Sequence, residues 1–252
     1  MAQPVGTLVK AMTLLNALGE KGPMGVMDLS RSLDLDKSAV SRLLTTLRSG
    51  GFVRISADGR YDLGLRLFEL GVYLQNRMPV RKLIIPFVER LAVETEETAI
   101  AVHYDQGQIA YLYQSISRQE IRLEEPVGLR CPPWEHVAGK LILSIFPDKV
   151  VQELWEADQK TGANKLTNWK SFLSELDRIR KQNLAIERGD EKSYVVVPLP
   201  TSPELIGNKR VGAALMVGGP SYRLTQKKLL EIAELAKEIA TEAAIEVGFY
   251  SK

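Results

Sequence analysis

The sequence has few of the residues that metal centres, disulfide frameworks and cofactor loops require. Its 252 residues include one cysteine, Cys131, and two histidines, His103 and His136. A single cysteine excludes an intrachain disulfide framework and is typical of a reducing compartment. Because a zinc site needs three or four clustered ligands, we expect no metal. Gly218-Gly219-Pro220 resembles a turn and not a phosphate-binding loop, so we expect no cofactor.

Sequence signals for the membrane and for export are also missing. No apolar run approaches the length of a membrane span. Residues 1–4 have neither the basic flank nor the apolar core of a signal peptide. We therefore expect a cytoplasmic protein that makes no membrane contact.

The charge is nearly balanced overall but is unevenly distributed. The chain carries 33 basic and 31 acidic residues, a net charge of +2, which alone does not indicate a nucleic-acid partner. Residues 1–78 hold ten basic and seven acidic side chains, whereas the remaining residues have a small acidic excess. The first third could therefore bind a polyanion. With 45% hydrophobic residues, the chain has the composition of a globular protein, and its length favours two compact units.

The first third has the pattern of a helix-turn-helix. Residues 7–19 place apolar side chains at helical spacing and end at a glycine. A short second helix presents Val26, Leu29 and Leu33 on one face, and a third helix runs from Asp36 or Lys37 to Arg48. Two short helices joined by a few residues form this motif.

The third predicted helix has one apolar face and one polar face without an acid. The polar stripe consists of Ser38, Ser41, Arg42, Thr45 and Arg48. A solvated surface is the plainer interpretation of such a stripe. Many solvated faces include glutamate for pairing along the helix, however, and short hydroxyls with arginine suit a major groove.

A hairpin follows the third helix directly. Asp58-Gly59 is a strong two-residue turn, and apolar side chains alternate on both sides of it. The hairpin would form the wing of a winged helix, with Arg54 and Arg60 available for phosphate or minor-groove contacts. A plain surface hairpin is the alternative.

These segments resemble the IclR family of bacterial transcriptional regulators. The most specific stretches are residues 35–47 (LDKSAVSRLLTTL), 51–54 (GFVR) and 58–67 (DGRYDLGLRL). The resemblance implies a winged helix-turn-helix over residues 1–64, a linker helix over 65–78, and an effector-binding and oligomerisation domain over 79–252. The DNA-facing residues that it implies are Lys37, Ser38, Ser41, Arg42, Thr45, Arg54 and Arg60.

The remaining two thirds are predicted to form an α+β sheet domain. Strands are expected at 98–104, 108–115, 121–124, 195–199 and 210–217, with helices at 65–77, 80–96 and 224–247. The IclR resemblance implies a GAF-like sheet with a ligand cleft on one face.

The family arrangement places the loop at 127–137 opposite residues 187–194, and this suggests an effector pocket. Trp134 and Tyr194 could act as aromatic walls, while His136 and Arg130 could bind a carboxylate together with the backbone N–H groups of a helix start. We therefore expect a small organic acid, most simply an aromatic one. The expected contact residues are Leu129, Arg130, Trp134, His136, Val137, Ala138, Glu187, Asp190, Ser193 and Tyr194.

A purely structural role is an equally open interpretation for several of these residues. Trp134 could belong to the core, Arg130 could pair with Glu124 or Glu125, and His136 could be an ordinary residue at a helix start. The stretch Trp134-Glu135-His136 replaces a His-Ala-Ser/Thr pattern of the family, so the identity of the effector does not carry over.

Three functions fit these patterns. The first is a ligand-responsive transcriptional regulator that binds double-stranded operator DNA as a homodimer or a dimer of dimers, with repression as the family default. The second is an enzyme that acts on a small organic acid, with Cys131 and His136 in the cleft and an N-terminal docking module. The third is a scaffold whose winged helix binds protein. We expect the first, and hence no catalysis.

Overall fold

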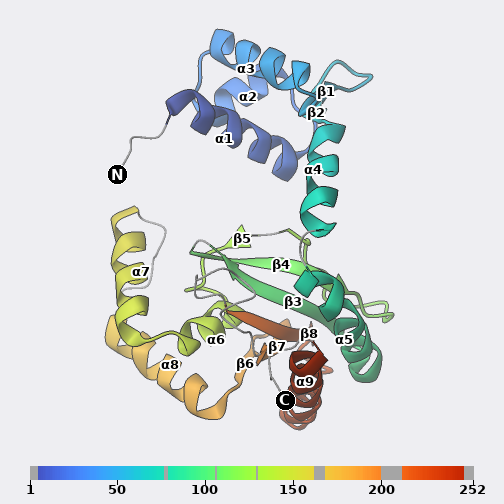
Figure 1. Cartoon of the computed structure of the whole chain (residues 1–252), viewed down its shortest axis with the longest axis vertical. Helices are drawn as coiled ribbons and strands as arrows, with labels where there is room; N and C mark the ends of the chain where they lie inside the picture. The colour runs from blue at the N-terminus through green and yellow to red at the C-terminus, as the bar shows by residue number, and fades with distance from the viewer. Residues whose placement is uncertain are drawn as a thin grey trace. The chain divides into compact units, whose positions relative to one another are not determined.

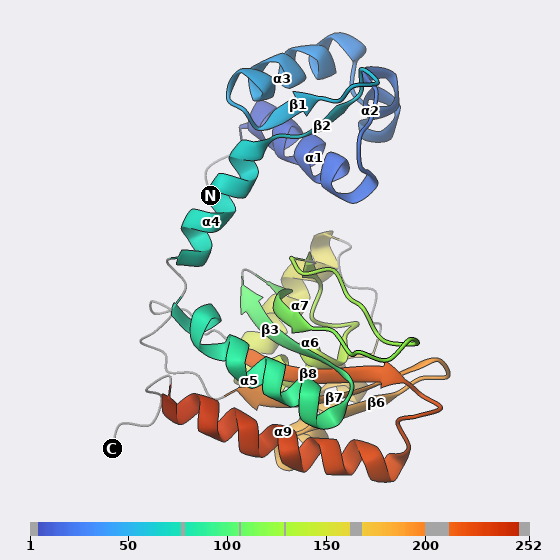
Figure 2. The same ribbon diagram turned by 90° about the vertical axis from the view of Figure 1, so that its right-hand side faces the viewer.

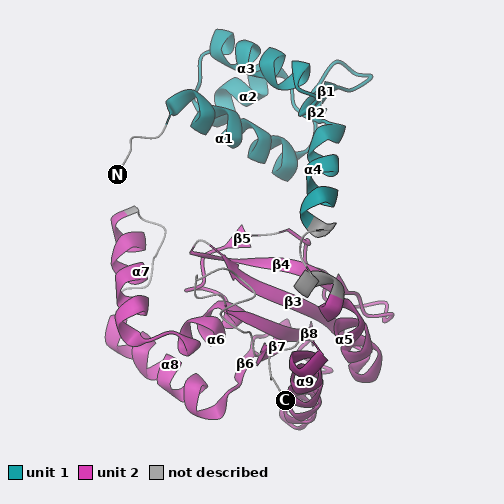
Figure 3. Ribbon diagram, viewed as in Figure 1, with its two compact units in different colours: residues 1–79 teal, residues 80–252 magenta. Residues whose placement is uncertain are grey.

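The computed structural model describes residues 5–76, 79–105, 107–128, 130–161, 168–199 and 212–246. The chain divides into two compact units, residues 1–79 and 80–252, which Figure 3 colours separately. No helix in the described ranges has both the length and the apolar character that crossing a membrane would require.

The first unit is a three-helix bundle with a hairpin and a following helix (Figure 1). Its elements are α1 (Gly6–Lys21), α2 (Val26–Leu33), α3 (Lys37–Ser49), β1 (Val53–Ile55), β2 (Tyr61–Leu63) and α4 (Leu65–Asn76). Its core is formed by the apolar side chains of Leu14, Leu18, Leu29, Val40, Leu44 and Val53. The helix-turn-helix and the hairpin are therefore present as the sequence predicts.

Two glycines fix the wing to the end of α3. Gly51 has a φ of +76°, which favours glycine, and the Gly64 N–H donates to the Phe52 carbonyl oxygen at 2.8 Å. A Cβ on Gly64 would lie 2.1 Å from the carbonyl oxygen of Gly51, so no other residue fits there without displacing the backbone. The close approach sets where the wing leaves the helix bundle.

The second unit is built on an antiparallel sheet with the strand order β5-β4-β3-β8-β7-β6. Its strands are β3 (Thr98–Asp105), β4 (Gln108–Ser115), β5 (Arg130–Cys131), β6 (Ala185–Arg188), β7 (Lys192–Leu199) and β8 (Ala213–Pro220). The predicted hairpin at 98–115 is confirmed. The predicted strand at 210–217 begins in the structure at Ala213, and residues 200–211 lie outside the described ranges.

Helices cover both faces of this sheet (Figures 1 and 2). Alternate side chains of β3 divide between the two cores: Ala99 and Ala101 face one, and Ile100 and Val102 face the other. The first core lies under α5 (Pro79–Thr95) and α9 (Gln226–Glu246). The second lies under α6 (Val137–Ile145), α7 (Asp148–Thr161) and α8 (Trp169–Gln182).

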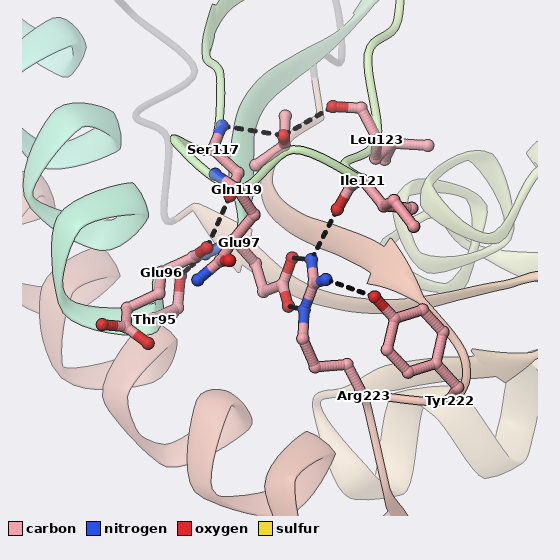
Figure 4. Close-up of polar contacts among 10 residues, drawn as sticks. Thr95, Glu96, Glu97, Ser117, Gln119, Ile121, Leu123, Tyr222 and Arg223 are labelled. Carbon is pink, nitrogen blue, oxygen red and sulfur yellow. Dashed lines mark hydrogen bonds and ion pairs between the residues drawn. The ribbon is translucent and has the colours of Figure 1, made fainter.

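The prediction of a strand at 121–124 is wrong. These residues form an irregular segment whose backbone oxygens are bonded by side chains (Figure 4). Thr98 Oγ1 donates to the Leu123 carbonyl at 2.6 Å, and Arg223 Nη2 donates to the Ile121 carbonyl at 2.9 Å. Because side chains supply these hydrogen bonds, the segment needs no neighbouring strand.

Candidate DNA-binding and effector sites

The polar stripe of α3 lies on the surface of the first unit. All five predicted residues of this helix are exposed, whereas Val40 and Leu44 on its opposite side are fully buried. Within the described ranges, Lys37 and Arg42 make no ion pair, so both charges are available. The exposed, uncompensated face of α3 has the chemistry of a helix that enters a groove of DNA.

The wing arginines are paired with acids of the same hairpin. Arg54 donates to Asp62 at 2.7 Å, and Arg60 donates to Asp58 at 2.6 Å. Hydrogen bonds from Ser56 and Arg60 lower the pKa of Asp58 to about 2, and the hydrogen bond from Arg54 lowers the pKa of Asp62. The wing is therefore electrically balanced in the free protein.

The sequence did not predict this balance, because the predicted length of the turn gives a different strand register. A two-residue turn at Asp58-Gly59 would pair Arg54 with Leu63. In the structure the connection is one residue longer, so Arg54 lies opposite Asp62. Both pairs are exposed to solvent, and such pairs are weak. Both arginines can consequently exchange their carboxylates for phosphates.

In the second unit, His136 is the N-cap of α6. Its Nδ1 accepts the backbone N–H of Ala138 at 3.2 Å, so the ring proton is on Nε2, which lies 2.8 Å from the Tyr111 hydroxyl. Burial, and then the nearby charge of Lys140, lower the pKa of His136 to about 4. The imidazole is therefore neutral near pH 7 and donates its Nε2–H to Tyr111.

Tyr111, His136 and Tyr194, here called the aromatic cluster, come from β4, α6 and β7. The His136 ring centroid lies 5.8 Å from that of Tyr111 and 5.9 Å from that of Tyr194, in edge-to-face geometry. The Tyr194 hydroxyl makes a long hydrogen bond of 3.5 Å to Glu125 Oε1. Burial raises the pKa of Tyr111, and burial together with Glu125 raises the pKa of Tyr194 to about 12, so both phenols stay neutral.

Tyr111 and Glu125 are members of this site that sequence analysis did not select. The alternation along β4 could have indicated Tyr111, because Ile109 and Tyr111 are buried on the same face. No local pattern indicated Glu125, since it lies in the irregular segment after β4.

The structure places Trp134 in the core, which is the alternative to a ligand contact that the sequence left open. The side chain is fully buried and packs edge-on against Trp155 and Phe172. Its Nε1 donates to Asp158 Oδ2 at 2.7 Å. The expected aromatic wall therefore presents no surface to a ligand in this structure.

Arg130 points to the turn between β3 and β4. Its guanidinium donates to the Gln108 side chain and to the Asp105 carbonyl, both at 3.0 Å, and lies 3.5 Å from the Asp105 carboxylate. The partner is thus neither Glu124 nor Glu125. Arg130 is not one of the groups that meet at the aromatic cluster.

The other predicted contact residues are dispersed. Val137 and Ala138 are buried at the start of α6, where His136 occupies the Ala138 N–H. Ser193 is buried with its hydroxyl 2.9 Å from that of Ser221, while Glu187 and Asp190 are exposed. Leu129 lies outside the described residues. Among the described residues, the structure thus brings His136 and Tyr194 into ring contact, and Glu187 lies opposite Tyr194 in the register of β6 and β7.

The geometry does not provide a thiol nucleophile. Burial, and then Glu125 and Glu135, raise the pKa of Cys131 to about 11, so the group stays a thiol near pH 7. The described residues also contain no group of three or more histidine, cysteine, aspartate and glutamate side chains placed to hold a metal ion.

Family models match both parts of the chain. A model described as the IclR helix-turn-helix domain matches residues 7–55, and one described as bacterial transcriptional regulator IclR C-terminal matches residues 72–244. The chain belongs to the IclR family. The predicted family, the winged helix-turn-helix and the α+β class are therefore confirmed, and the IclR helix-turn-helix implies a DNA partner.

Individual relatives agree with this assignment. The chain is 28% identical over 251 residues to the HTH-type transcriptional regulator KdgR of Escherichia coli K12, covering 98% of this chain and 94% of KdgR. It is 27% identical over 260 residues to the HTH-type transcriptional repressor AllR of the same strain, with the same coverage. A crystal structure of an IclR homologue from Microbacterium hydrocarbonoxydans, complexed with 4-hydroxybenzoate, has a TM-score of 0.77 at 17% identity. That comparison covers 97% of this chain and the whole of the other, and it shows a shared fold.

Proposed function

We propose that this IclR-family protein is a repressor that binds operator DNA through α3 and responds to a small organic effector in its second unit. The exposed, acid-free stripe of α3 carries the proposal, because its arginine and hydroxyls match the donors and acceptors of base edges. The name of AllR, a repressor, supports repression as the direction of control. A regulator of transcription works at the chromosome, and hence in the cytoplasm.

The proposed DNA contacts divide into two kinds. Lys37 and Ser38, at the start of α3, contact phosphates, while Ser41, Arg42 and Thr45 face base edges. Thr45 Oγ1 donates to the Ser41 carbonyl at 2.9 Å, so its hydroxyl proton is engaged within the helix. Arg54 and Arg60 reach the backbone or the minor groove once their aspartates are replaced by phosphates.

Self-association through the first unit is part of this proposal. Apolar side chains are exposed on α1 and α4, among them Leu8, Met12, Leu65, Phe68 and Leu74. Exposed apolar patches of this kind typically mark interfaces, and a helix-turn-helix dimer reads two half-sites. We therefore assign these faces of α1 and α4 to a homodimer contact, with residues 65–78 as linker. A dimer of dimers would use further surface.

The proposed effector is a ring-bearing molecule that contacts the aromatic cluster. The 4-hydroxybenzoate in the complex of the structural neighbour is also a small molecule with one ring. The sequence prediction of an aromatic acid keeps two of its expected ring contacts, His136 and Tyr194. It loses Arg130, which is engaged at the turn between β3 and β4, and Trp134, which is buried. The effector is bound and not transformed, because Cys131 is a thiol and His136 is engaged with Tyr111.

Arg42→Ala tests the DNA interface. If Arg42 contacts a base, the variant should lose about 1–3 kcal/mol of binding to the upstream intergenic DNA of its own gene. Fluorescence anisotropy across a salt series measures both this loss and the steep salt dependence of a DNA-binding protein. Arg66→Ala, on α4 and paired with Glu69, removes the same charge as a control. Equal binding by both variants would remove Arg42 from the interface.

A further inference from the structure

The charges around the aromatic cluster do not favour an anionic ligand. His136 is neutral, and the Arg130 guanidinium is occupied at the turn between β3 and β4. Lys140 lies 3.1 Å from Glu175, which compensates its charge. Lys192, an exposed side chain on β7, lies 3.9 Å from the Glu125 carboxylate and forms a long ion pair with it.

Acidic groups, in contrast, face the cluster. Glu125 is largely buried, with 18% of its side chain exposed. Burial raises the pKa of Tyr111, Cys131 and Tyr194, and the charge of Glu125 raises it further. Glu187 adds to the same effect at Tyr194. A carboxylate ligand would therefore meet like charges here, while Arg130, Lys140 and Lys192, among the residues that the structure describes, are already paired. Like charges cost binding energy in a partly buried site.

The segment that carries Glu125 is held firmly in place. The Glu125 N–H donates to the Gln114 side chain at 3.2 Å. Earlier in the segment, the Ile121 carbonyl accepts from Arg223, whose guanidinium also forms a two-point pair with the buried Glu97 at 2.6 and 2.9 Å (Figure 4). These contacts hold the backbone of the segment, and the Glu125 carboxylate accepts a long hydrogen bond from the Tyr194 hydroxyl.

The cluster also has a hydrogen-bond donor without an acceptor. Because His136 donates its Nε2–H to the Tyr111 oxygen, the hydroxyl proton of Tyr111 points elsewhere. Among the described residues no acceptor receives this proton, and Tyr111 is 97% buried. A buried donor of this kind is costly unless a ligand or water accepts from it. The site therefore offers one acceptor, Glu125, and one donor, Tyr111.

We propose that the effector is a small planar molecule that carries N–H groups and no net negative charge, such as an amide, a lactam or an amidine. Its N–H groups donate to Glu125, an acceptor atom or π-face receives the Tyr111 proton, and its ring packs against His136 and Tyr194. The inference rests on the proposed function, in which the second unit binds an effector, and names the chemical class of that effector.

Three probes of nearly the same shape test this class: benzoate, benzamide and benzamidine, with charges of −1, 0 and +1. Titration calorimetry with the full-length protein should give benzamidine and benzamide at least about tenfold tighter binding than benzoate. In Glu125→Gln the preference over benzoate should disappear. Glu124→Gln, an exposed neighbour paired with Arg122, removes the same charge outside the site and should keep the preference.

The outcomes separate this inference from the proposed function. Benzoate binding as tightly as benzamidine, or no binding by benzamidine at millimolar concentration, would overturn the proposed effector class. If Glu125→Gln kept the preference for benzamidine and benzamide over benzoate, that result would also overturn the proposed effector class. Anisotropy of labelled operator DNA without any probe tests the regulator itself, so a failure of DNA binding would count against the proposed function alone.

Discussion

At the scale of single residues, His136 shows how one hydrogen bond determines the chemistry of a site. The N-cap bond from Ala138 occupies Nδ1, and this leaves Nε2–H to donate to Tyr111. The side chain is therefore both the structural start of α6 and a neutral member of the aromatic cluster. The structural and functional interpretations of His136 are thus compatible.

The depressed pKa of His136 predicts a loss of stability in acid. In the folded protein the pKa is about 4, against 6.5 for the unfolded chain, so between these values the unfolded state binds more protons. The contribution of His136 to the free energy of unfolding is complete above about pH 6.5 and is lost as the pH falls toward 4. By about pH 4.5 the loss should reach roughly 2–3 kcal/mol.

Urea unfolding of the wild type and of His136→Gln at several pH values measures this contribution. The half-buried His103, whose pKa is also lowered by burial, is present in both proteins, so its effect cancels in the difference. The stability advantage of the wild type should shrink as the pH falls. An advantage that stays constant or grows in acid would contradict the neutral, capping role.

At the scale of elements, the wing combines a rigid attachment with compensated charges. Gly51 and Gly64 hold the hairpin against the end of α3, while Asp58 and Asp62 neutralise its two arginines. The arginines are therefore kept in defined positions without adding net charge. We expect the wing to orient the protein on DNA more than to drive its binding.

Release of one wing arginine should strengthen DNA binding. Asp62→Asn removes the carboxylate that accepts from Arg54. Arg54 can then contact a phosphate without first breaking an ion pair. Exposed pairs contribute about 0.2–1 kcal/mol, so affinity should rise by about two- to fivefold. Asp28→Asn on α2 removes an equal charge without releasing an arginine, and anisotropy compares the two. A gain no larger than that of Asp28→Asn would show that Arg54 contributes nothing.

At the scale of the whole molecule, assembly decides whether two reading helices reach one operator. A single helix-turn-helix binds one half-site, and specific affinity comes from two linked copies. The exposed apolar faces of α1 and α4 are the surfaces of the first unit that we assign to this contact. Dimer formation and operator affinity should then change together.

Phe68→Asp tests this link. Phe68 is 68% exposed on α4, so the change should leave the fold intact, but it places a charge in the proposed apolar contact. Analytical ultracentrifugation should show dissociation of the dimer, together with at least about tenfold weaker operator binding. Leu230→Asp, an exposed apolar site on α9, should leave this dimer unchanged. A Phe68→Asp protein that remains dimeric would place the contact elsewhere.

Elements with local sequence signals could be predicted before the fold was known. The spacing of apolar residues over 7–48, the Asp58-Gly59 turn and the alternation at 98–115 predicted the winged helix-turn-helix and the first hairpin of the sheet. The polar stripe of α3 could be predicted as well, because the residues that it needs are three and four positions apart on one helix.

The side chains that meet at the proposed effector site come together through long-range packing. Arg130 pairs with Asp105, Trp134 enters the core beside Trp155, and Glu125 reaches Tyr194, 69 residues later in the chain. Likewise Arg223 binds Glu97, which lies 126 residues earlier, and this pair helps to hold a segment that the sequence suggested was a strand. Such partners depend on how distant strands and loops pack, and local spacing carries no information about that packing.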